Sequence, residues 1–105
     1  MSEAANPARG EAAFRVGDAS IRLRPTFARL VAAENELGSL FALADRACAG
    51  EVKLGEVAVL FDHLSDGDRP DTIDRQRIGD ALAAGGLAAV MAPLRIVLVQ
   101  ILEGR

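Results

Sequence analysis

The chain has 105 residues and a formal net charge of −3; half of its residues are apolar, but only four are aromatic, all of them phenylalanine. A chain of this length forms one domain with a modest aliphatic core, which excludes multi-domain architectures and suits packed helices. The negative charge and the lack of a dense basic run argue against nucleic acid as a general partner.

Residues 1–8 are polar and rich in alanine, and we expect them to form a flexible tail before a single domain over residues 9–105. They lack a basic start followed by an apolar region, so no signal peptide is predicted. Cys48 is the only cysteine, which excludes an internal disulfide and indicates a reducing compartment, where its thiol would be buried as a small hydrophobe. We therefore expect a cytoplasmic protein.

A β-hairpin is predicted around Gly17-Asp18, as a two-residue turn of type II′ because glycine comes first. On one face this turn pairs apolar residues: Ala12 with Leu23, Phe14 with Ile21 and Val16 with Ala19. On the other it pairs Glu11 with Arg24, Ala13 with Arg22 and Arg15 with Ser20. One face of the hairpin is therefore expected to be buried and the other solvated.

A helix is expected from Phe27, because Pro25 ends the second strand and Thr26 can cap the helix. It ends before Gly38, and its predicted inner face is Phe27, Leu30, Val31 and Leu37. Glu34 interrupts this face. Glu34 either flanks the core and pairs with Arg22, Arg24 or the start of the next helix, or it contacts a partner.

Two further helices follow, residues 40–48 after the capping residue Ser39 and about residues 54–64. The inner face expected of the first is Leu40, Phe41, Ala44, Ala47 and Cys48. That of the second is Leu54, Val57, Ala58, Phe61 and Leu64. Residues 65–70 then break the chain.

The next helix is predicted over residues 73–84, capped by Asp71 or Thr72 and stopped by Gly85-Gly86. Its inward residues are expected to be Ile78, Ala81 and Leu82. The last helix is apolar on almost every side, and Pro93 should kink it or mark a boundary. It is too short and too interrupted to predict a membrane span, so it is either a central core helix or a protein-binding surface.

The fold class expected from these elements is α+β and mainly α, with an N-terminal two-stranded hairpin packed on a bundle of four to five helices. No enzyme, cofactor or metal is predicted. His63 is the only histidine, and the neighbouring Asp62 projects in another direction on a helix. The aspartates around Gly67 do not form an EF-hand loop, because Leu64 and Ile73 would occupy its third and twelfth positions.

The chain also resembles a known family. The motifs that carry the resemblance are Asn6-Pro7, Arg9-Gly10-Glu11, Leu23-Arg24-Pro25-Thr26-Phe27, Ala33-Glu34, Leu37-Gly38-Ser39-Leu40, Val52-Lys53-Leu54 and Gly85-Gly86-Leu87. In this order, around a hairpin, they resemble the gene transfer agent family of small phage-tail proteins. The resemblance implies a tail protein of a phage-like particle, acting as an assembly chaperone for an apolar tail component such as the tape measure.

Two alternatives stay open. One is a structural tail subunit, such as a tube or adaptor component, although tube subunits are rich in β-strands and this chain has one hairpin. The other is a small regulatory or nucleic-acid-associated module that uses the hairpin arginines.

The expected partners are tape measure or tube proteins, with a homo-oligomer as a further option, in the bacterial cytoplasm during particle assembly. The partner-binding residues that we predict are Leu94, Leu98, Ile101 and Leu102 of the last helix, with Arg22, Arg24 and Glu34 as secondary contacts.

Overall fold

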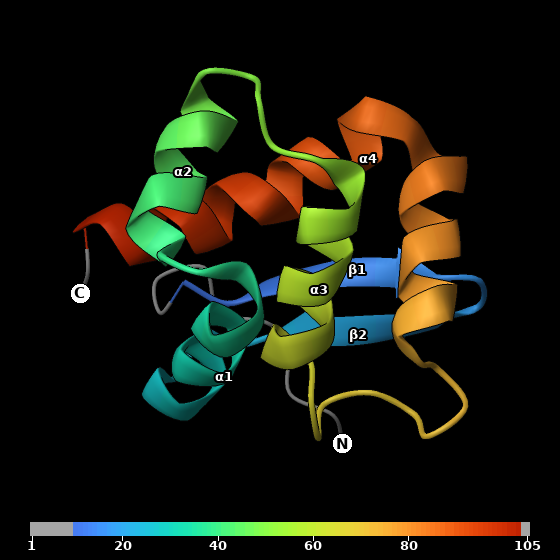
Figure 1. The fold of residues 1–105 in the computed structure, drawn as a ribbon. Coiled ribbons are helices and arrows are strands. Elements are labelled where there is room, and N and C mark those ends of the chain that lie inside the picture. The colour runs from blue at the N-terminus through green and yellow to red at the C-terminus, as the bar shows by residue number, and fades with distance from the viewer. Residues whose placement is uncertain (1–9, 104–105) are drawn as a thin grey trace.

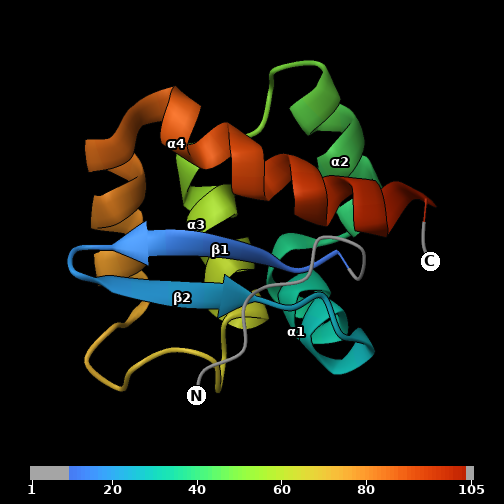
Figure 2. The same ribbon diagram turned by 180° about the vertical axis from the view of Figure 1, so that it is seen from behind.

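The computed structural model describes residues 10–103 and has the predicted class, α+β and mainly α (Figure 1). The predicted tail, residues 1–8, lies outside the described residues. The elements are β1 (Ala12–Val16), β2 (Ala19–Leu23), α1 (Phe27–Leu37), α2 (Leu40–Cys48), α3 (Leu54–Leu64) and α4 (Arg75–Glu103). Figure 2 shows the hairpin lying across one side of the helices, with α3 and the first part of α4 behind it and the C-terminal part of α4 alongside β1.

The hairpin has the predicted register, from Ala12 opposite Leu23 to Val16 opposite Ala19. Gly17 has a φ of 63°, and Asp18 has no positive φ, which excludes a type I′ turn and agrees with type II′. The apolar face is buried, and Phe14 meets Phe61 of α3 edge-on, with ring centroids 5.3 Å apart. The alternating pattern of the two strands therefore supplies one side of the core.

Helix α1 begins and ends as predicted, but its inner face is different. The hydroxyl of Thr26 accepts a hydrogen bond from the amide of Arg29, which caps the helix. Ala33 is completely buried, whereas Phe27 is 83% exposed and Val31 is 38% exposed. The prediction that Phe27 and Val31 face the core is therefore wrong.

Two charged residues explain how α1 is rotated. Arg29 donates to the carbonyl of Leu64 at 3.1 Å, and Glu36 accepts from the guanidinium of Arg75 at 2.6 and 2.7 Å. These two residues are seven positions apart and so lie on the same side of the helix, next to Ala33. Satisfying their distant partners turns the small Ala33 towards α3 and leaves Phe27 outside.

Helix α3 keeps most of its predicted inner residues, whereas in α2 only Leu40 and Ala44 of the predicted inner face are buried. In α2, Leu40, Leu43 and Ala44 are buried, while Phe41 and Cys48 are exposed, contrary to prediction. In α3 the buried residues are Val57, Ala58, Leu60, Phe61 and Leu64. Leu54 is exposed, which is a further error at the first residue of that helix, where few neighbours cover a side chain.

Helix α4 contains a sharp break. It begins at Arg75 and not at residue 73, because the carboxylate of Asp74, and neither Asp71 nor Thr72, accepts from the amide of Arg77 at 2.9 Å. Gly86 has a φ of 74°, so Arg75–Gly86 and Ala88–Glu103 form two halves bent by 119°.

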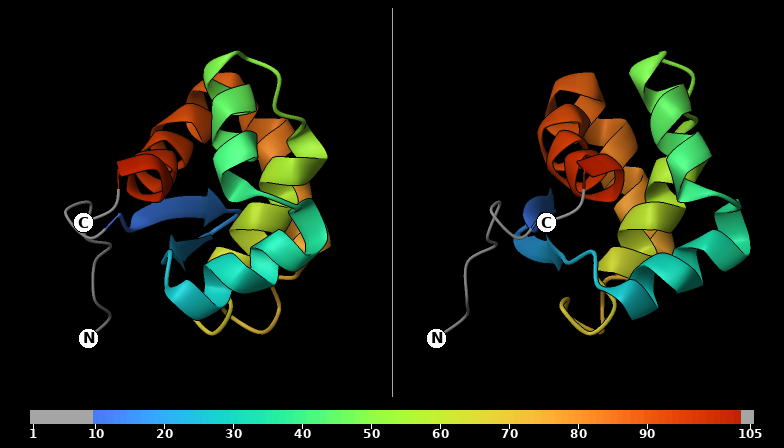
Figure 3. Two further views of the ribbon diagram at one scale, coloured as in Figure 1. Left: turned by 60° about the vertical axis from the view of Figure 1, so that its left-hand side comes forward. Right: turned by 90° about the vertical axis from the view of Figure 1, so that its left-hand side faces the viewer.

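Pro93 lies inside the second half, Ala88–Glu103, and does not end a helix there. The break between the two halves is at Gly86 and not at the proline. Figure 3 shows the second half of α4 running past α2 and over the hairpin.

Asp68, in the loop between α3 and α4, ties that loop to the hairpin and to α1. Its carboxylate lies 2.6 Å from Arg29, 3.1 Å from Arg22 and 3.6 Å from Arg24. The backbone reinforces this attachment, because the amide of Arg24 donates to the carbonyl of Leu64 at 2.8 Å. Burial raises the pKa of Asp68, but the arginines outweigh it and leave this pKa below 3.8.

Replacing Asp68 with asparagine removes the charge that the three arginines share. We expect Asp68→Asn to lower the free energy of unfolding by about 1–3 kcal/mol, measured by urea denaturation. Because the folded-state pKa is depressed, this contribution is present above about pH 3.8 and is lost as the pH falls through the lowered value. The matched control is Asp66→Asn in the same loop, where the side chain is exposed; an equal loss there would contradict the assignment.

Candidate functional site

An apolar hollow of about 540 Å³ lies between the C-terminal end of α2 and the second half of α4. Its lining residues are Ala47, Cys48, Gly50, Val52, Met91, Leu94, Arg95, Leu98, Val99 and Leu102. Three of the predicted partner-binding residues, Leu94, Leu98 and Leu102, are therefore brought together. Arg95 is the charged residue in this lining.

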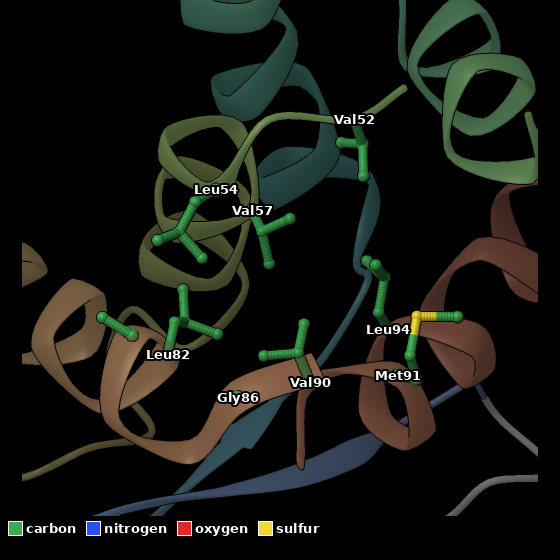
Figure 4. A pocket seen from close by; sticks show the side chains of 9 residues that line it. Val52, Leu54, Val57, Leu82, Gly86, Val90, Met91 and Leu94 are labelled. Atoms are coloured by element: carbon green, nitrogen blue, oxygen red, sulfur yellow. The ribbon is translucent and has the colours of Figure 1, made fainter. Parts of the chain in front are cut away.

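A second hollow of about 320 Å³ continues the first across the bend of α4. The two share Val52, Met91 and Leu94. The second adds Leu54, Val57, Leu82, Ala83, Gly86 and Val90. Figure 4 shows Leu54 and Val57 of α3 facing Leu82 and Val90 of α4 across this space. We call the two hollows together the apolar groove.

The second half of α4 has two apolar faces. Val90, Leu94 and Val97 are buried and hold the helix on the core. On the other face Met91 is 39% exposed, and Val99 and Leu102 are each 44% exposed. The two readings of this helix, core or protein-binding surface, therefore apply to different faces of it.

An ion pair between α2 and α3 positions the wall of the groove. The guanidinium of Arg46 donates to both carboxylate oxygens of Glu56, at 2.7 and 2.8 Å. The same carboxylate accepts from the amide of Lys53 at 2.9 Å. These bonds lower the pKa of Glu56 to about 2, Arg46 contributing most. They hold the end of α2 next to the start of α3, with Val52 between them.

The other predicted partner-binding residues lie outside the groove. Ile101 and Glu34 line a separate hollow of about 220 Å³ with the exposed residues Phe27, Val31 and Phe41. The carboxylate of Glu34 accepts from the amide of Leu40 at 3.0 Å, which is the predicted pairing with the start of the next helix.

Arg22 and Arg24 remain on the hairpin. Arg22 pairs with Asp68, and the Nε atom of Arg24 lies 3.5 Å from a carboxylate oxygen of Glu11, the predicted cross-strand pair. Glu11 is buried, although its face of the hairpin was expected to be solvated. These arginines are therefore engaged within the fold, and their role towards a partner stays a prediction.

Sequence reasoning missed the part of the groove that lies outside the last helix. Val52 and Cys48 enter the lining because the chain turns back between α2 and α3. On α4 itself a signal existed, because Met91, Arg95, Leu98 and Leu102 recur at spacings of three and four residues and define one helix face.

The titratable side chains outside the groove form structural clusters. His63 lies 2.7 Å from Glu36, and Asp62 pairs with Arg69 and Arg75, so both are half-buried in ion pairs that join α1, α3 and α4. Hydrogen bonds from Arg75 and then His63 lower the pKa of Glu36 to about 2. Within residues 10–103, no three histidine, cysteine or acidic side chains come together in a way that could hold a metal ion.

The apolar length of α4 also bears on membranes. No helix in the described part of the chain is by itself long and apolar enough to cross a bilayer. The two halves of α4 meet that criterion only when taken together, across the bend.

Comparison with known proteins gives one match. A family model described as phage tail tube protein, GTA-gp10, matches residues 9–104. The chain belongs to the GTA-gp10 phage tail tube protein family. No curated protein and no solved structure matches it.

Membership of the GTA-gp10 family confirms the resemblance to gene transfer agent proteins and makes this a phage-like tail protein. The family description names a structural tail protein and not an enzyme. It also agrees better with the tube alternative than with the assembly chaperone that the resemblance first implied.

In this GTA-gp10 family protein, the contact between Arg46 and Glu56 can be tested by titration. Since the pKa of Glu56 falls from 4.5 to about 2 on folding, its contribution to stability is present above about pH 4.5 and is lost as the pH falls towards 2. In Arg46→Ala we expect the Glu56 carboxyl, followed by NMR, to titrate closer to 4.5. Arg77→Ala, which changes an exposed arginine away from the groove, should leave that titration unchanged.

Proposed function

We propose that this protein is a structural component of the tail tube of a phage-like particle, joined to neighbouring tail proteins through the apolar groove. The observation that carries the proposal is the match to a tail tube family over residues 9–104. The protein would act in the bacterial cytoplasm while particles assemble and would remain in the finished tail.

The lining of the groove supports a role in protein binding. It is almost wholly apolar and partly exposed, and exposed apolar patches on monomeric proteins commonly mark interfaces. An elongated apolar groove formed by helices suits the apolar face of a helix from another protein. Covering Met91, Val99 and Leu102 would add roughly 1 kcal/mol each, since about half of each side chain is already buried.

A second candidate is an assembly chaperone that holds an apolar segment of a tail component, such as the tape measure, before the tube forms. The observation in its favour is the two-stranded sheet, the only one among the described residues. A hairpin offers little strand edge for building a continuous β-rich wall. The same groove would then hold its client transiently.

The composition of purified particles separates these two functions. We expect mass spectrometry of particles from the producing bacterium to find this protein in several copies per tail. A protein that is missing from particles, yet co-purifies from the lysate with an unassembled tail component, would contradict the structural proposal and support the chaperone.

The contribution of the groove can be tested with a charged residue at an exposed position in it. We expect Leu102→Glu to reduce association with tail proteins at least tenfold, because binding would bury the new carboxylate. Phe27→Glu is the matched control, since Phe27 is more exposed and lies outside the groove. Both variants should keep the circular dichroism spectrum of the native protein. Equal losses in both would contradict a role for the groove.

A further inference from the structure

The outer side of α2 carries a row of exposed residues beside the apolar groove. Phe41, Asp45 and Cys48 follow one another at spacings of four and three residues, so they share one side of the helix. Phe41 is 61% exposed, and Asp45 and Cys48 are also exposed. We call these three residues the α2 stripe. Its C-terminal member, Cys48, is also part of the wall of the groove.

The α2 stripe contributes little to the fold of its own chain. Helix α2 is held on the core by its buried residues Leu40, Leu43 and Ala44, and no member of the stripe is among them. A phenylalanine with most of its surface in water is costly in solution, because covering it would release about 1.5–3 kcal/mol. Phe41 therefore offers an apolar anchor, while the groove at the other end of the helix offers an apolar recess.

The charges on these two features are complementary. Asp45 lies on the stripe, and Arg95 lies in the lining of the groove. Both side chains are exposed, and neither forms a hydrogen bond or ion pair with any other residue in the described range 10–103. Arg46 differs, because Glu56 already neutralises it. One free carboxylate and one free guanidinium thus accompany the anchor and the recess.

We propose that two copies of this chain pair about a two-fold axis through α2, with Phe41 of each copy seated in the apolar groove of the other. In an antiparallel pair of α2 helices centred between Ala44 and Asp45, position 41 of one copy lies opposite position 48 of the other. Both ends of the pair then make the same contact, as a two-fold interface requires. Asp45 pairs with Arg95 of the second copy, which fixes the orientation more than it adds affinity.

This dimer goes beyond the proposed tail function and does not depend on it. The pairing covers the groove of each copy while the protein is free. A tail protein that uses the groove must then displace the second copy, so assembly becomes an exchange of one apolar partner for another. The aggregation that an open groove would favour is thereby reduced.

Sedimentation equilibrium of the purified full chain tests the pairing. We expect a reversible, concentration-dependent dimer, and Phe41→Ala should raise its Kd roughly ten- to a hundredfold. Arg77→Ala, the control, should leave the Kd within about twofold, because Arg77 is exposed near the start of α4 and lines neither the groove nor the hollow beside Phe41. A monomer at every concentration, or an equal effect of the two substitutions, would overturn the proposal.

Charge reversal tests the orientation. Asp45→Arg and Arg95→Asp should each weaken the dimer, and the two together should restore it. Failure of the double variant to recover would overturn this arrangement.

A disulfide variant separates a two-fold pair from a chain of copies. In Phe41→Cys, the new thiol and Cys48 lie about 10 Å apart along one helix, too far for a disulfide within one chain. With oxidised glutathione as the oxidant, the two-fold pairing predicts a closed covalent dimer. A ladder of larger covalent oligomers would indicate head-to-tail contacts and overturn the two-fold axis.

The Phe41→Ala variant also separates the dimer from the proposed tail function. This substitution leaves the groove intact, so incorporation of the variant into particles reports on the tail function alone.

Discussion

The left-handed backbone at Gly86 is the constraint on which the rest of the structure depends. Residues 75–103 are largely apolar, and as one straight helix of 29 residues they could not pack against a core this small. The φ of 74° at Gly86, which glycine adopts without strain, folds the second half back beside the first. Helix α4 then contacts both α3 and β1, and Figure 2 shows its second half running alongside β1.

The same bend explains why a groove is left over. The second half of α4 is apolar around most of its circumference, but only part of it is covered: Val90, Leu94 and Val97 are buried, and Ile96, Leu98 and Ile101 pack partly against the core. Helix α2 approaches from the side and is fixed there by Arg46 and Glu56, so it borders the remaining face without closing over it. The groove is thus the part of an apolar helix that a domain of this size does not cover.

Much of the fold followed from local patterns. Alternation of apolar residues and the turn at Gly17 gave the hairpin register, and Thr26 and Ser39 marked two helix starts. The rotation of α1 did not follow, because Arg29 and Glu36 bond to residues more than 25 positions away. Within the site, the helical spacing of Leu94, Leu98 and Leu102 was enough to place them together.

The α2 side of the groove depends on a tertiary ion pair, Arg46 with Glu56, that no local pattern shows.

The two faces of the second half of α4 also bear on how such proteins diverge. Substitutions at Val90 or Val97 act on folding, whereas those at Met91 or Val99 act on a surface that the core does not use. Selection can therefore alter the partner specificity of this helix while its stability stays nearly constant. A tail system that acquires a changed neighbouring protein could adapt to it through a few side chains on one helix face.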